Sequence, residues 1–233
     1  MKKILTIAVA ALAVVSMTSC GGSRAMKNDV DTLSYAMGTD FGASLLRLVN
    51  SLEDEMNMDL FYQGVEDVLN DEVVMEQQEA YAFLRKYMNV TNPTKALENS
   101  TAYLAEIEKM DGVQKTESGL LYQIVREGNL DKKATLDTDE VRVMYEGKTR
   151  KGKVFDSSYE RGDTAKFALN QVIKGWTEGM KLVGEGGEIK LWIPSNLAYG
   201  ARGTRDGSIG PNTAITFTVE LVEVIPSATE EAK

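Results

Sequence analysis

The spacing of hydrophobic residues along the chain changes once, near Gly112. From Asp31 to about Met110, apolar side chains recur every three to five positions, which is the period of an amphipathic helix. From Val113 onward, polar and apolar residues alternate, which is the period of a strand with one buried face. The pattern therefore predicts an α+β chain, with an all-helical N-terminal half and then a small antiparallel sheet wrapped on a short helix.

The helical half contains residues that favour helix ends. Thr32 is a candidate N-cap for a helix that runs to Val49. Pro93 disfavours helical backbone at Asn92, so we expect the helical pattern to break there, with Pro93 at an early position of the next helix. Three further helices are predicted over residues 59–69, 72–88 and 94–110.

Clusters of Gly, Asn and Asp separate the alternating runs of the second half and mark its turns. One short helix is expected among the strands, over residues 175–182, and Trp192 is interpreted as a structural residue on a strand face. Strands are predicted over residues 120–125, 140–145, 188–193 and 213–221.

The helical half contains too little apolar volume for a substantial core of its own. Six of the 11 methionines lie between Met26 and Met88, and methionine packs both in cores and in adaptable interfaces. A second copy of the chain would bury more of this surface. We therefore predict a homodimer that forms through a helical domain at residues 31–92, followed by a connecting helix at residues 93–112.

The N-terminus has the features of a bacterial signal peptide. Lys2 and Lys3 supply positive charge, residues 4–15 are apolar but too few to span a bilayer, and small residues precede the only cysteine, Cys20. This arrangement resembles a lipobox, in which Cys20 is lipidated and becomes the first residue of the mature protein. An ordinary cleaved signal with an incidental cysteine is the alternative. The interpretation predicts a signal peptide over residues 1–19 and a lipidated tether over residues 20–30.

The same segment predicts where the protein is found. A lipidated Cys20 would anchor the chain to a membrane of the bacterial cell envelope without a spanning helix. The residues just after Cys20 lack an acidic run, which favours the periplasmic side. We expect the membrane to be a partner through this anchor.

Composition excludes several classes of chemistry. The chain has no histidine, which excludes Ser-His-Asp and Cys-His hydrolysis and His-ligated zinc. A single cysteine excludes an intramolecular disulfide and a multi-cysteine metal site. The formal net charge of −9 argues against a nucleic-acid partner, which favours a basic surface. We predict neither a metal nor a cofactor.

Aromatic and apolar residues gather in short motifs beside turns in the second half. Together they would form an apolar cup that holds an apolar group and excludes water. Each residue alone is more often part of a core, so the prediction depends on the joint pattern. The candidate residues are Tyr145, Phe155, Phe167, Val172, Ile173, Trp176, Tyr199, Ile209 and Phe217.

Six motifs follow one another in fixed order: V-x-Y-E-G at 143–147, V-F-D-S-S at 154–158, F-x-L-x-Q-V-I-x-G-W-x-E-G-M at 167–180, G-x-x-x-x-x-I-P at 187–194, L-A-Y-G at 197–200, and I-G-P-N at 209–212 with its F-x-V-E-L ending at 217–221. In this order they resemble the FK506-binding (FKBP) family of peptidyl-prolyl cis–trans isomerases. The likeness runs from about Gly119 to Ile225, within a predicted isomerase domain at residues 113–226 and before a solvated tail at residues 227–233. The helical half resembles the N-terminal dimerisation domain of the Mip-like subfamily, whose secreted bacterial members form V-shaped homodimers.

The resemblance implies a half-conical sheet over a helix, with a proline ring held between them. Trp176 would form the floor of the site, and Asp156 would hold a polar edge beside Tyr145. The implied catalytic residues are Tyr145, Phe155, Asp156 and Tyr199. The implied substrate-binding residues are Phe167, Val172, Ile173, Trp176, Ile209 and Phe217.

Three departures from the family pattern bear on inhibitor affinity and substrate preference. Ala165 stands where family members commonly carry an aromatic residue. The loop at residues 163–172 is shorter than in single-domain members, and residues 202–208, at the rim of the site, differ in sequence.

The implied activity is isomerisation of X–Pro bonds in unfolded or proline-containing exported polypeptides, with FK506- or rapamycin-like macrolides as ligands of the same pocket. Rotation about the amide bond faces a barrier of about 18–20 kcal/mol because the planar form is conjugated. A pocket of low polarity favours the twisted form, and no acid, base or nucleophile is required. The alternative function is an envelope chaperone or holdase whose pocket binds proline with little catalysis.

Overall fold

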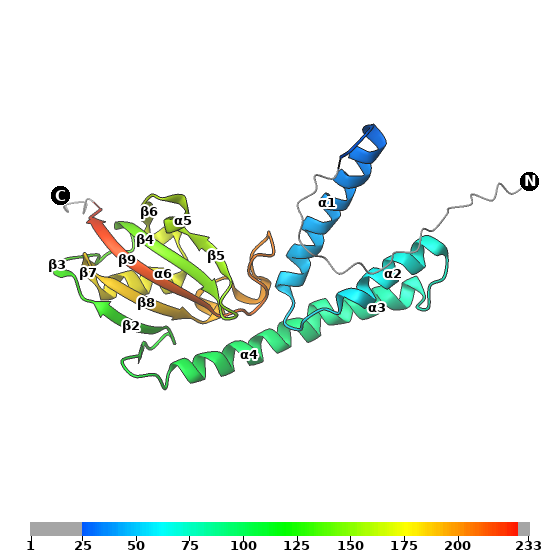
Figure 1. The fold of residues 1–233 in the computed structure, drawn as a ribbon. Helices are drawn as coiled ribbons and strands as arrows, with labels where there is room; N and C mark the ends of the chain where they lie inside the picture. Colours follow the sequence, from blue (N-terminus) through cyan, green and yellow to red (C-terminus); the bar gives the residue numbers. More distant parts are fainter. Residues whose placement is uncertain (1–24, 228–233) are drawn as a thin grey trace, which may run out of the picture. The chain divides into compact units, whose positions relative to one another are not determined.

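The structure is a computed structural model that describes residues 25–227. The chain falls into two compact units, residues 1–41 and 42–233, with the boundary inside helix α1 (Asp29–Ser51). Each unit is described by itself, and Figure 1 gives the order of the elements along the chain. The predicted signal peptide and Cys20 lie outside the described residues.

Helix α1 begins at Asp29, before the predicted cap at Thr32. The Asn28 side chain accepts a hydrogen bond from the Asp31 backbone N–H at 2.9 Å, which is the contact that an N-cap residue makes. Thr32 lies inside the first turn instead, where its hydroxyl donates to the Asn28 carbonyl at 3.1 Å. The predicted cap was wrong because Asn28 satisfies the first free N–H groups earlier in the chain.

The next helices are α2 (Met58–Asn70), which agrees closely with the prediction, and α3 (Gln77–Lys86), which starts later than predicted. The break predicted at Asn92 does not occur. A π-helical turn, η1 (Tyr87–Thr91), leads directly into α4 (Asn92–Ile107), and the Asn92 N–H donates to the Tyr87 carbonyl. Pro93 lies in the first turn of α4, where a missing N–H costs little. The widened π turn therefore lets the chain stay helical through proline.

Seven antiparallel strands form the main sheet of the second half, in the order β1-β2-β8-β9-β4-β5, with β6 also paired to β4. Their bounds are β1 Gln114–Lys115, β2 Leu121–Arg126, β4 Glu140–Thr149, β5 Val154–Ser157, β6 Ala165–Ala168, β8 Glu188–Ile193 and β9 Ile215–Ile225. A second, two-stranded sheet pairs β3 (Asn129–Lys133) with β7 (Gly184–Glu185). The sheet and the helical N-terminal region confirm the predicted fold class.

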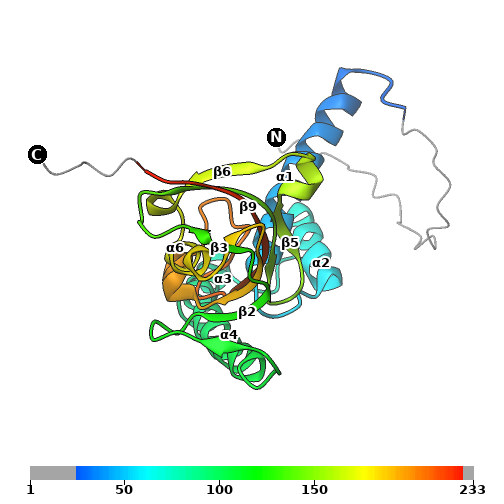
Figure 2. The same ribbon diagram turned by 90° about the vertical axis from the view of Figure 1, so that its left-hand side faces the viewer.

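One short helix, α6 (Lys174–Gly179), lies against the inner face of this sheet and continues as a 3₁₀ turn, Met180–Leu182. Figure 2 shows the sheet curving around it. Gly175 permits the close approach, because a Cβ there would stand 2.5 Å from the Ile193 side chain of β8. The core between helix and sheet includes the fully buried Val141, Met180, Ile189, Leu191, Ile215 and Leu221.

Strand register brings the predicted site residues to one face. On β4, alternate residues are buried, so Tyr145 points to the same face as Val141 and Val143. Phe167 of β6 lies opposite Val141, and Phe217 of β9 lies opposite Gly147. The period-two pattern of these strands therefore carries three aromatic side chains to the face that α6 covers.

Candidate functional site

A cavity of about 270 Å³ opens at the N-terminal end of α6. This volume lies just below the roughly 300–1,000 Å³ typical of pockets for drug-sized ligands and leaves room for a proline residue. Nine residues from β4, β5, β6, β9, α6 and the loops before α6 and after β8 contribute to it. They are Tyr145, Asp156, Phe167, Gln171, Val172, Ile173, Trp176, Tyr199 and Phe217.

Trp176 is the centre of the aromatic lining. Three rings meet its indole nearly edge-on, with centroids 5.2 Å away for Tyr145, 5.5 Å for Phe167 and 5.1 Å for Phe217. Edge-to-face contacts of this kind hold rings more firmly than apolar burial alone. Trp176 is 4% exposed, and its indole N–H has no acceptor among the described residues. The floor of the cavity is therefore rigid and apolar, with one unused donor.

Phe155 lies behind this lining. Its ring meets Phe217 edge-on with centroids 5.5 Å apart, and it is not among the residues that line the cavity. Gly147 is the residue against which both rings pack, since a Cβ there would lie 2.6 Å from Phe217 and 2.8 Å from Phe155. The glycine of the V-x-Y-E-G motif is thus required by close approach of two rings to the backbone.

Three side chains form a polar edge on the cavity. The Tyr145 hydroxyl donates to Asp156 at 2.6 Å. Arg161 donates to the other Asp156 oxygen at 2.6 Å and to the Tyr145 oxygen at 2.9 Å. The guanidinium carbon also lies 5.6 Å from the centre of the Tyr145 ring. Asp156 and Arg161 therefore fix the orientation of Tyr145 from two sides.

The protonation states follow from these contacts. Burial alone would raise the pKa of Asp156, but hydrogen bonds from Tyr145 and Arg161 outweigh it, and the net pKa lies below its usual range. Burial, and then the bond to Asp156, raise the pKa of the Tyr145 hydroxyl. At neutral pH the edge therefore contains an ionised Asp156, a protonated Tyr145 and the Arg161 guanidinium.

Tyr199 and Ile209 both belong to the loop between β8 and β9, but only Tyr199 lines the cavity. Tyr199 is 37% exposed and lines the cavity. Burial, and then the charges of Asp156 and Asp206, raise the pKa of its hydroxyl, so it stays protonated at neutral pH and can donate a hydrogen bond. Ile209 is 2% exposed and belongs to the core instead of the cavity lining. Of the predicted site residues within the described chain, all but Phe155 and Ile209 line the cavity.

Two residues at the site were missed in the sequence. Gln171 lines the cavity within the Q-V-I motif. Arg161 reaches Asp156 because the one-turn helix α5 (Ser158–Arg161) follows β5 directly. Its local signal was present, since the Ser157 side chain caps the Glu160 N–H and Gly162 ends the turn with φ +70°. A capped turn of this length returns its last residue toward the strand before it.

The cavity has aromatic walls, and its edge carries the hydroxyls of Tyr145 and Tyr199, the Asp156 carboxylate and the Gln171 amide. Among the described residues, no group of three acidic or cysteine side chains is arranged to hold a metal ion. The geometry fits a ligand that is bound by shape and desolvation.

Comparison with known proteins is consistent with this geometry. A family model described as "FKBP-type peptidyl-prolyl cis-trans isomerase" matches residues 131–222, and one described as "Domain amino terminal to FKBP-type peptidyl-prolyl isomerase" matches residues 30–124. A probable FKBP-type peptidyl-prolyl cis-trans isomerase of Haemophilus influenzae is 37% identical over 98% of this chain and 99% of its own length. The chain belongs to the FKBP-type peptidyl-prolyl cis–trans isomerase family.

Other relatives place the isomerase within the family. FkpA of Escherichia coli K12 is 35% identical over 97% of this chain and 87% of its own, and a Legionella longbeachae protein named "Outer membrane protein MIP" is 30% identical over 97% and 99%. The crystal structure of E. coli FkpA superposes with a TM-score of 0.57 at 34% identity, covering 88% of this chain and all of that one. A Pseudomonas syringae peptidyl-prolyl isomerase gives 0.52 at 32% identity, covering 57% and 96%.

These matches establish the enzyme class that the resemblance implied. They favour isomerase activity over the alternative of a holdase with little catalysis. Within the part of the chain that the structure describes, no helix is both long and apolar enough to cross a bilayer.

Proposed function

We propose that the cavity over Trp176 is the active site of the isomerase and that its substrates are proline-containing, unfolded or partly folded exported polypeptides. The observation that carries this proposal is the convergence of the Tyr145, Phe167 and Phe217 rings on Trp176 around an open cavity. A pyrrolidine ring inserted there contacts ring faces and edges on several sides. The polypeptide on either side of the proline stays outside, so the site accepts many sequences.

Catalysis follows from what the cavity lacks. The planar X–Pro amide is conjugated and charge-separated. Rotation about its C–N bond removes that conjugation and faces a barrier of about 18–20 kcal/mol. An apolar environment stabilises the planar form less than water does, and so lowers the cost of twisting. The enzyme then gains rate by binding the twisted amide better than either planar one.

Polar groups at the edge hold the rest of the substrate. The Tyr199 hydroxyl and the Ile173 backbone N–H donate to substrate carbonyls in this proposal. Asp156 and Arg161 act by holding Tyr145 in place, because their hydrogen bonds to it are already formed. Asp156 stays ionised throughout and transfers no proton.

We also propose that the protein works as a lipid-anchored homodimer at the periplasmic side of the cell envelope. The signal-like segment that ends at Cys20 supports the anchor, and the relative named as an outer membrane protein supports the location. Exposed apolar side chains along α1, α2 and α3 support dimerisation through residues 31–92. FK506-like macrolides would compete with proline for the cavity.

The test is a proline-limited refolding assay with Phe155→Ala and Asp156→Ala variants of the full chain. We expect each to lower kcat/KM at least tenfold, because one removes the support of Phe217 and the other releases Tyr145 and Arg161. Tyr159→Ala is the matched control. It removes an exposed ring that is close in sequence to Phe155 and Asp156 but does not line the cavity. Circular dichroism checks that each variant is folded. Two pocket variants as active as the Tyr159 control would place the active site elsewhere.

A further inference from the structure

The loop that carries Tyr199 is held in place by the connecting helix. We define the rim loop as residues 199–213, between β8 and β9. Its interior is ordered by its own contacts: the Thr204 N–H donates to the Ile209 carbonyl at 2.9 Å, and the Ile209 N–H donates to the Thr204 hydroxyl at 3.0 Å. Ile209 is buried in the core. The loop interior is therefore held together and fixed to the core at Ile209, and the contacts of its two stems determine where Tyr199 lies.

The two stems are joined at Asn212. Its backbone N–H donates to the Gly200 carbonyl at 2.9 Å, directly beside Tyr199. Asn212 has a left-handed backbone with φ +52°, a conformation that asparagine tolerates better than most residues. Any displacement of Asn212 is therefore passed to Gly200 and to the tyrosine next to it.

Helix α4 binds this junction at three points. The Asn212 side-chain amide donates to the Pro93 carbonyl at 3.0 Å. The Ser100 hydroxyl donates to the Asn212 carbonyl at 2.9 Å and accepts from the Ala214 N–H at 3.0 Å. Ser100 is 3% exposed, so water cannot easily replace these bonds. Without α4, three polar groups of the stem would need other partners.

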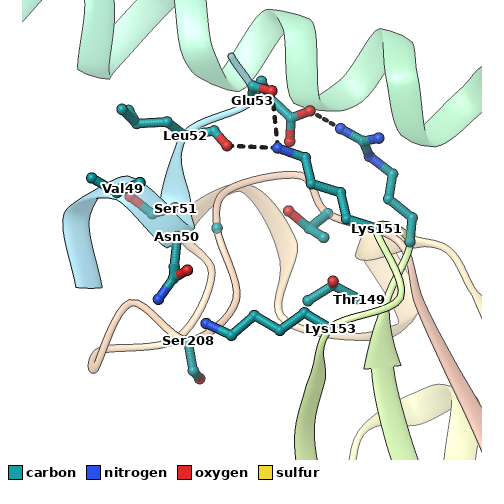
Figure 3. Close-up of a pocket in the computed structure, with 12 residues that line it drawn as sticks. Val49, Asn50, Ser51, Leu52, Glu53, Thr149, Lys151, Lys153 and Ser208 are labelled. Atoms are coloured by element: carbon teal, nitrogen blue, oxygen red, sulfur yellow. Dashed lines mark hydrogen bonds and ion pairs between the residues drawn. The ribbon is translucent and has the colours of Figure 1, made fainter. Parts of the chain in front are cut away.

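The segment before α2 meets the rim loop by backbone packing, since a Cβ at Gly210 would stand 3.0 Å from the Ser51 carbonyl oxygen, and that oxygen accepts a hydrogen bond from the Asn92 side chain of α4. The Lys151 ammonium donates to the carbonyls of Leu52 and Glu53 at 2.8 and 2.9 Å (Figure 3), so this segment is bound to the turn between β4 and β5. A hollow of about 140 Å³, lined in part by Ser208, lies between that segment and the rim loop. The hydrogen-bonded route to the rim loop runs through α4.

We propose that Ser100 and Asn212 are positioning residues of the isomerase, through which α4 sets the place of Tyr199 at the cavity. This inference rests on the proposed function, because it requires Tyr199 to contact the substrate. Pro93, Asn212, Gly200 and Tyr199 form a continuous chain of two hydrogen bonds and one peptide link. The helical half is then part of the catalytic apparatus, although none of its residues lines the cavity.

A double-mutant cycle in the full chain tests the proposal. Asn212→Asp keeps the size of the side chain and its tolerance for positive φ. It removes the amide N–H that donates a hydrogen bond to the Pro93 carbonyl. We expect it to lower kcat/KM for a proline-containing peptide about 3- to 10-fold. In a Tyr199→Phe background the same change should cost less than about 2-fold, because it acts through Tyr199. Losses that multiply in the double variant would overturn the inference.

One control variant and one further anchor variant complete the test. Asn129→Asp adds the same charge on β3, where the side chain needs only its acceptor oxygen for the Asp131 N–H, and we expect no loss of activity. Ser100→Ala removes the other two hydrogen bonds between α4 and this junction and should also be coupled to Tyr199→Phe, which covers the case in which Asn212→Asp does not fold. The Gly200 amide resonance should shift in both anchor variants and not in the control. An unmoved resonance would also overturn the inference.

The same experiment separates this inference from the proposed function. If Phe155→Ala and Asp156→Ala retain full activity, the proposed active site is wrong. If they lose activity while Ser100→Ala and Asn212→Asp behave like Asn129→Asp, only the positioning role is wrong.

Discussion

The helices before α4 leave their apolar side chains exposed, whereas the sheet domain buries its own. Within the described chain, α1, α2 and α3 contain no buried residue, and large apolar side chains such as Leu60, Phe83 and Leu84 are more than half exposed. In the sheet domain, Leu191, Ile189 and their neighbours are fully buried against α6. The sheet domain is complete as a single copy, whereas the helices present the kind of surface that a partner normally covers.

The energy associated with this difference is large. Burying one Leu or Phe side chain contributes about 1.5–3 kcal/mol, so the exposed positions of the helices leave several such contributions unused. The sheet domain uses them internally to build a rigid cavity. We infer that the fold of the active site depends on its own core, while the arrangement of the helices depends on association.

The largest predicted effect is on folding and compares one leucine from each region. Leu191→Ala should destabilise the sheet domain by about 2–5 kcal/mol, because it opens a cavity under α6 in a fully buried position. Leu60→Ala, at a position that is 65% exposed on α2, should change the same unfolding transition far less. Urea unfolding followed by tryptophan fluorescence measures both, since Trp176 and Trp192 are the two tryptophans of the chain. Equal shifts in the two variants would contradict the comparison.

The sequence predicted the sheet domain best where one face of a strand is buried. The strand over residues 188–193 was predicted to the residue, because polar and apolar residues alternate over its first four positions, although Leu191, Trp192 and Ile193 are all buried. The strands β5 and β6 were missed, since each has four residues and shows no alternation long enough to detect. The helix break predicted at Asn92 from the following Pro93 was also wrong, because a π turn keeps the helix continuous there.

Some residues of the candidate site could likewise be predicted from sequence motifs, and others could not. Trp176, Phe167 and Phe217 could be named from motifs, because each motif carries its aromatic residue at a fixed strand or helix position. For Arg161 the sequence contained only the signal of a capped turn. Its contact with Asp156 and the contacts of Ser100 depend on how a one-turn helix and a distant helix meet the strands. Ile209 was assigned to the rim from its loop position, and its burial depends on packing that the loop sequence does not reveal.

The second prediction concerns association of the helices. Leu60→Glu and Leu84→Glu should raise the dimer dissociation constant at least 100-fold, which corresponds to about 2.7 kcal/mol, because each places a charge in the proposed interface. Leu136→Glu is the control, since this leucine is also exposed but belongs to the sheet domain. Analytical ultracentrifugation at micromolar concentration measures all three. A wild-type chain that sediments only as a monomer would remove the proposed dimer altogether.

The two regions also differ in how they hold acidic groups. Asp139, before β4, is 3% exposed, and its carboxylate accepts from the backbone N–H groups of Thr135 and Leu136 at 2.8 and 2.9 Å and from that of Ser227 at 2.9 Å. Asp54, between α1 and α2, is exposed and bonds to the side chains of Tyr87 and Lys95. The Asp139 carboxylate joins the segment before β4 to the segment after β9, and the Asp54 carboxylate lies at the surface.

The smallest predicted effect uses these two residues. Asp139→Asn should cost about 2 kcal/mol at pH 7, because a charged acceptor of several buried N–H groups is lost. Burial would raise the pKa of Asp139, but the hydrogen bonds from Leu136, Ser227 and Thr135 outweigh it, and the folded-state pKa lies below its ordinary value. The stabilisation is therefore complete above the unfolded value of about 3.9 and is lost as pH falls through the folded-state pKa. Urea midpoints of wild type and Asp139→Asn should converge below about pH 4, while Asp54→Asn should shift the midpoint less at pH 7. A gap between wild type and Asp139→Asn that stays constant down to the lowest pH at which the chain folds would show that the carboxylate's charge is not what stabilises this end of the sheet domain.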